Sequence, residues 1–283
     1  MRKSLFVLLA VTLVSQPPAQ AQKTAPAPVK RTLTYADLAD LALASRIAAA
    51  VRVRTAVRLK GVDAATVLPG RKRYLVTADV LALIRATESI PPRITYVIDV
   101  APDAAGKFPK LTKGEAIAFA TPVPGFPGEV RLVSPDAQIA ASPDNLAKVR
   151  TILKEAEGPD APPVVTAVGD AFHVPGNLPG EGETQVFLES ADGRPVSLSI
   201  LRAPGKPPLW SVALGEVVDQ GAEPPRRNTL TWYRLACALP ATLPGSSTAS
   251  LEPEQARLAR EDYGAVIDGL GACARSLAIR PGT

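Results

Sequence analysis

The amino-acid sequence predicts an α+β protein with a β-rich N-terminal domain and a smaller α+β C-terminal domain. The first observation is the strict alternation of VRVRTAVRLK over 51–60, which is typical of a half-buried strand because successive side chains leave opposite faces. The second is that strand-like segments follow one another up to residue 133 with no helices between them. This order favours a five-stranded antiparallel sheet or small barrel with flanking helices. The third is a pair of cysteines, Cys237 and Cys273, on helix-like segments near the C-terminus.

The first residues have the pattern of a secretory signal peptide. Arg2 and Lys3 precede an uncharged apolar run over 5–14 and a small-x-small end at 19–21. The run is too short to cross a bilayer, which needs about 20 apolar residues, although an uncleaved anchor is the alternative. We therefore predict a signal peptide over 1–21 and a periplasmic or secreted mature chain with no transmembrane segment. The composition, rich in Ala, Pro and Arg, favours a bacterial source.

Composition also predicts where the domains begin and end. A lead-in over 22–33 is rich in Pro, Ala and Lys and is typical of a flexible segment. The β-rich domain is expected over 34–158 and the α+β domain over 163–278. A run rich in proline, 159–163, separates them.

In the first domain, a helix is expected to begin at a capping box formed by Thr34 and Asp37 and to run to about Ala50. The organising strand follows almost directly, with its odd-numbered residues buried. A second helix should begin after Ser142 and end at Gly158. The other expected strands cover 74–85, 93–100, 115–121 and 129–133.

In the second domain, a loop over 169–182 is expected to contain His173, the only histidine. A short helix should follow Thr229. The last helix begins at Pro253, and its apolar stripe reaches Cys273 and Leu277. The expected strands cover 164–168, 184–189, 196–200 and 210–214.

The two cysteines are predicted to form a disulfide. An exported chain meets an oxidising compartment, and antiparallel packing of the two helices would bring Cys237 and Cys273 together. Closing a loop of this length is worth about 3–4 kcal/mol in chain-entropy models. Two free thiols are the alternative, because sequence does not show their distance. Two thiols and one distant histidine lack zinc-like spacing, so we expect neither a metal nor a cofactor.

Charge is unevenly distributed along the chain. Residues 31–140 contain 15 basic and 10 acidic residues, whereas 161–283 contain 10 basic and 13 acidic residues. The net positive charge of the first segment and the net negative charge of the second are compatible with docking of one segment on the other. They are equally compatible with a basic face that binds an acidic partner.

A basic set on the first two strands is the main candidate binding site. If these strands are neighbours, their charges converge on one sheet face, which could bind a polyanion such as an envelope polymer. A nucleic-acid partner is disfavoured because few aromatic side chains lie among the charges. The alternative is a solvated strand face that resists aggregation. The candidate residues are Arg52, Arg54, Arg58, Lys60, Arg71, Lys72 and Arg73.

Motifs for catalysis are absent from the sequence. It contains no GxSxG, Walker A, HExxH or dinucleotide fingerprint. His173, with Asp170 close by, is a candidate loop base, but a hydrogen-bonded structural histidine is the alternative. Asp79 and Asp99 are unusual inside expected strands and are candidate functional carboxylates. A position on an edge strand or in a bulge is the alternative explanation. Paired carboxylates that cleave a polymer remain open.

We therefore favour a non-catalytic envelope protein whose cationic strand face binds an anionic envelope polymer or another envelope protein. A hydrolase of cell-envelope polymers that uses paired carboxylates is the first alternative. A structural or assembly protein of the envelope is the second.

Overall fold

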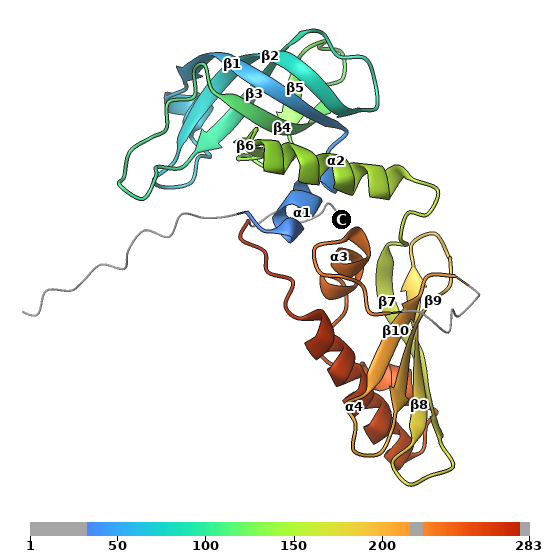
Figure 1. Cartoon of the computed structure of the whole chain (residues 1–283). Helices are drawn as coiled ribbons and strands as arrows, with labels where there is room; N and C mark the ends of the chain where they lie inside the picture. The colour runs from blue at the N-terminus through green and yellow to red at the C-terminus, as the bar shows by residue number, and fades with distance from the viewer. Residues whose placement is uncertain (1–32, 216–222, 278–283) are drawn as a thin grey trace, which may run out of the picture.

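The computed structural model describes residues 33–215 and 223–277. The expected signal peptide and nearly all of the expected lead-in lie outside these ranges. Two antiparallel sheets are joined by a layer of helices, and a fourth helix packs on the second sheet (Figure 1). The predicted α+β class is therefore confirmed.

The first sheet has strand order β3-β2-β1-β4-β5, and β6 pairs with the free stretch of β4. The sheet curls into a small barrel, because the Thr95 amide of β3 donates to the carbonyl of Gly128 and the Asp99 amide donates to that of Pro135. The expected five strands were one too few, since β6 is too short to show an alternation pattern. The strands are β1 (Ile47–Arg58), β2 (Lys72–Ala86), β3 (Arg93–Val100), β4 (Glu115–Pro122), β5 (Val130–Leu132) and β6 (Gln138–Ala140).

Helix α1 (Tyr35–Ala44) begins at the expected capping box, in which Thr34 and Asp37 bond reciprocally. It does not run to Ala50, because residues 47–50 already belong to β1. These residues pair with both β2 and β4 and are buried. Pairing on both sides overrides the helix propensity of the alanine run.

The alternation of β1 holds only to Val53. A register shift between Val53 and Thr55 marks a bulge, after which the inward parity changes. Ala56 is half buried, whereas Val57 is 58% exposed, which corrects the expectation that all odd-numbered residues face the core.

Helix α2 (Pro143–Glu157) is capped by Ser142 as expected, and with α1 and α3 (Leu230–Ala236) it lies between the two sheets (Figure 1). Buried apolar side chains from both sheets and all four helices form one contiguous core. The second sheet has order β10-β9-β8-β7, and α4 (Pro253–Leu270) packs on its inner face. Its strands are β7 (Val165–Pro175), β8 (Gly182–Ser190), β9 (Val196–Arg202) and β10 (Leu209–Ala213).

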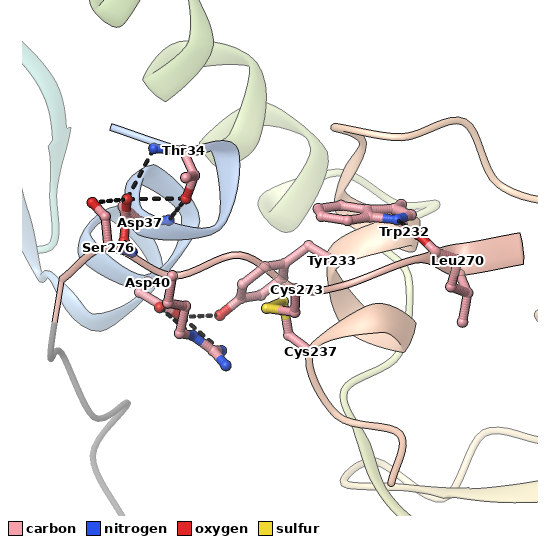
Figure 2. Close-up of a disulfide and its surroundings, with 10 residues drawn as sticks. Thr34, Asp37, Asp40, Trp232, Tyr233, Cys237, Leu270, Cys273 and Ser276 are labelled. Atoms are coloured by element: carbon pink, nitrogen blue, oxygen red, sulfur yellow. Dashed lines mark hydrogen bonds and ion pairs between the residues drawn. A yellow bond between two sulfur atoms is a disulfide. The ribbon is translucent and has the colours of Figure 1, made fainter. Parts of the chain in front are cut away.

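The disulfide between Cys237 and Cys273 is present, as predicted (Figure 2). Cys273 is not on a helix, however. Helix α4 ends at Leu270 because Gly271 adopts a positive φ of 66°, which favours glycine. The chain then continues without helix as a C-terminal segment, 271–277, that the disulfide ties to α3.

This C-terminal segment holds helix α1 through two buried carboxylates. Asp37 accepts hydrogen bonds from the amides of Ser276 (2.8 Å) and Leu277 (2.9 Å), in addition to its capping bonds. Figure 2 shows Asp37 between its capping partner Thr34 and Ser276. Asp40 accepts from Arg275 and from the hydroxyl of Tyr233. Burial would raise the pKa of Asp37, but these hydrogen bonds outweigh it and lower that pKa.

We predict that Asp37→Ala lowers the free energy of unfolding by about 3 kcal/mol, from a helix cap worth about 1 kcal/mol and the buried donors left without an acceptor. Urea denaturation followed by circular dichroism measures this. Asp144→Ala, at an exposed first-turn position of α2, is the control and should cost under about 1 kcal/mol. Equal losses in both variants would contradict the anchoring role of Asp37.

Candidate functional site

The seven predicted basic residues form two groups rather than one face. Arg52 precedes the bulge of β1, Arg54 is the unpaired residue within it, and both side chains are exposed on the outer face of the sheet. The other five lie at the far end of β1 and the start of β2, which are joined by the 3-10 helix η1 (Gly61–Ala64) and a turn. The bulge therefore separates charges that the sequence pattern places together.

Carboxylates neutralise the first group. Arg52 Nη2 lies 2.6 Å from Glu115 Oε1, and Arg54 hydrogen-bonds Asp79. Arg93 approaches the same Asp79 carboxylate at 3.1 Å. Hydrogen bonds from Arg54 and then Arg93 lower the pKa of Asp79. Asp79 is thus a counter-ion on the outer face.

The second group lines a hollow of about 360 Å³. We call it the cationic hollow. It lies between the end of β1, η1, the turn over 67–70 and the first residues of β2. Apolar side chains of Val67 and Leu68 share its wall. Its basic lining residues are Arg58, Lys60, Arg71, Lys72 and Arg73.

Arg73 and Arg71 shape the cationic hollow. Arg73 binds the Asp99 carboxylate with two hydrogen bonds of 2.7 and 2.8 Å, and Asp99 is almost fully buried. The remaining Arg73 nitrogen donates to Thr66 Oγ1 at 3.1 Å and to the carbonyl of Asp63, so it pins the β1–β2 connection to the sheet. Arg71 pairs with Asp136 at 2.9 Å. The unusual strand residue Asp99 is therefore a structural counter-ion.

Arg58, Lys60 and Lys72 make no ion pair with any residue that the structure describes. Arg58 and Lys60 are exposed. The Lys72 ammonium lies 3.6 Å from the ring centroid of Phe108, a cation–π contact that leaves its charge in place. The cationic hollow therefore carries uncompensated positive charge.

A second basic loop adjoins the cationic hollow. Phe108, which Lys72 contacts, belongs to the β3–β4 loop over 101–114, and Arg71 and Lys110 line a shared neighbouring hollow of about 430 Å³. Lys107, Lys110 and Lys113 are exposed. In the sequence these lysines lie more than 30 positions after the basic residues of the cationic hollow, and it is the pairing of β2 with β3 that brings the two loops together.

Carboxylate side chains also line the neighbouring hollow. Asp99, Glu115 and Asp136 line it. Each is held by an arginine: Asp99 by Arg73, Glu115 by Arg52 and Asp136 by Arg71. Carboxylates engaged in this way serve as counter-ions.

His173 lies in β7 and is buried, not in a loop as expected. Its Nδ1 lies 2.8 Å from Thr184 Oγ1, and Thr184 in turn donates to Asp262. Since the hydroxyl proton goes to the carboxylate, Nδ1–H donates to Thr184. In a catalytic triad the histidine lies between the nucleophilic hydroxyl and the acid. Here the Thr184 hydroxyl lies between His173 and Asp262. The geometry therefore gives His173 the role of a structural hydrogen-bond donor.

Among the residues that the structure describes, no cluster of three or more metal-ligating side chains occurs. None of the described helices has the length and apolarity needed to cross a membrane. The disulfide points to an oxidising, non-cytoplasmic compartment. Comparison with known families finds no matching family model, and comparison with curated proteins finds no matching sequence.

We predict a pH-dependent contribution of His173 to stability. Burial lowers the pKa of His173, the Arg202 charge lowers it further, and the Asp262 carboxylate opposes both. Below about pH 6.5 the unfolded chain therefore takes up a proton on this residue while the folded state keeps a neutral ring. Stability should fall with decreasing pH from this value, by at most about 1.4 kcal/mol per pH unit.

Urea denaturation of the protein and of His173→Gln at several pH values measures this contribution. The advantage of the parent over the variant should shrink as the pH falls from neutral toward the lowered pKa. An advantage that stays constant or grows would contradict the prediction.

Proposed function

We propose that this protein is a non-catalytic binding protein of the cell envelope, periplasmic or secreted, which holds an anionic polymer in the cationic hollow. The observation that carries the proposal is the gathering of five basic side chains around one hollow, three of them without an ion-pair partner in the described chain. Charge concentrated against low-dielectric walls raises the local concentration of an anionic ligand.

Preorganisation supports the proposal. The Arg73–Asp99 pair and the Arg73 bonds to Thr66 and Asp63 hold the β1–β2 connection before any ligand arrives. A site that is already shaped loses less conformational entropy on binding. Arg58 and Lys60 are then the groups that would contact phosphates or carboxylates of the ligand.

The hydrolase alternative gains no support from the carboxylates of the neighbouring hollow, since each is held by an arginine. The assembly alternative has one observation in its favour. The outer face of the second sheet exposes a group of large apolar side chains, and exposed patches of this kind often contact other proteins. The group comprises Phe172, Val174, Phe187, Leu201 and Leu209.

We predict that Arg58→Gln combined with Lys60→Gln weakens binding to soluble inorganic polyphosphate about tenfold or more, because two contacts worth about 1 kcal/mol each are lost. Isothermal titration at low ionic strength measures the affinity, which should also fall as salt is added.

Arg52→Gln combined with Arg54→Gln is the matched control. It also removes two positive charges, but from the outer face, where Glu115 and Asp79 already neutralise them. Polyphosphate affinity should therefore change less than about threefold. Equal losses in the two double variants would show a non-specific charge effect. Absence of polyphosphate binding by the parent protein would refute the proposed function.

A further inference from the structure

Two large apolar side chains stand in water beside the cationic hollow. Val62, in η1, is 89% exposed, and Leu68, on the wall of the hollow, is 66% exposed. Both belong to the β1–β2 connection, between the basic residues Arg58 and Lys60 on one side and Lys72 on the other. Loops that only turn the chain are usually built from small and polar residues.

The connection cannot readily bury these side chains by folding inward. Arg73 holds the carbonyl of Asp63, which follows Val62, and the hydroxyl of Thr66, two positions before Leu68. Arg73 is itself fixed by the buried carboxylate of Asp99. The apolar side chains are therefore held outward.

Cationic side chains surround them from two loops. The segments 58–73 and 101–114 meet at the contact of Lys72 with Phe108, and together they contain eight basic residues against only Asp63 and Asp103. We call this end of the barrel the basic tip. Its exposed lysines beyond the cationic hollow are Lys107, Lys110 and Lys113.

We propose that the basic tip binds the surface of an anionic lipid layer, with lysine and arginine side chains on headgroup phosphates and with Val62 and Leu68 inserted among the first acyl carbons. This inference rests on the proposed function, because the same cationic hollow supplies the phosphate contacts. A soluble polymer would leave Val62 and Leu68 in water. A lipid surface offers phosphate and hydrocarbon within a few ångströms of each other, which matches the arrangement of the tip.

The test is co-sedimentation of the full chain with vesicles of phosphatidylcholine alone or of phosphatidylcholine mixed with phosphatidylglycerol. We expect binding to the mixed vesicles only, since each basic residue near an anionic surface contributes about fivefold in partitioning. Val62→Ser combined with Leu68→Ser should reduce this binding about tenfold or more. Val62→Ser alone, at a residue that does not line the cationic hollow, should keep the affinity for soluble polyphosphate within about twofold, because every charge is retained.

Val174→Ser combined with Leu201→Ser is the matched control, because it removes one exposed valine and one exposed leucine from the outer face of the second sheet. Its vesicle binding should equal that of the parent. If the Val62 and Leu68 variant binds mixed vesicles as well as the parent, the lipid inference is wrong, while polyphosphate binding that depends on Arg58 and Lys60 would still uphold the proposed function. If the parent binds neither vesicles nor polyphosphate, both proposals fail.

Discussion

The ion pair between Arg73 and Asp99 is the interaction on which the candidate site depends. Asp99 is buried in β3 and would be costly there without a partner. Arg73 satisfies it with two hydrogen bonds and uses its third nitrogen to hold the β1–β2 connection. One guanidinium thus joins a buried charge in the barrel to the loop that shapes the cationic hollow. Breaking the pair would leave the Asp99 carboxylate buried without a partner and would also free the β1–β2 connection.

The sequence predicts most of the elements because their signals are local. The capping box of α1, the Ser142 cap of α2 and the alternation in β3 and β9 each depend on residues a few positions apart. The helix-to-strand boundary at 44–47 was missed because it depends on the pairing of β1 with two other strands. The same limit explains Cys273, whose place after α4 is set by one positive φ at Gly271.

The candidate site was predicted in part. Which residues carry charge is visible in the sequence, but which charges are neutralised is not. Arg54 finds Asp79 across 25 positions and Arg73 finds Asp99 across 26. The bulge at Arg54 then changes which face the later residues of β1 point to, so Arg58 does not share the face of Arg52. The alternation of apolar and basic residues does not reveal a β-bulge, because the extra residue shows only as a shift in the pairing of the two strands.

The C-terminal segment also has a consequence for how the chain reaches its native state. Asp37 and Ser276 are 239 positions apart, yet their hydrogen bond completes the first helix. During synthesis, the Asp37 carboxylate lacks these partners until residues 276 and 277 have been added to the chain. Contacts of such long sequence separation are slow to form, so the N-terminal and C-terminal halves acquire their final junction late and together. Partial chains would therefore expose the helical layer that the complete molecule conceals.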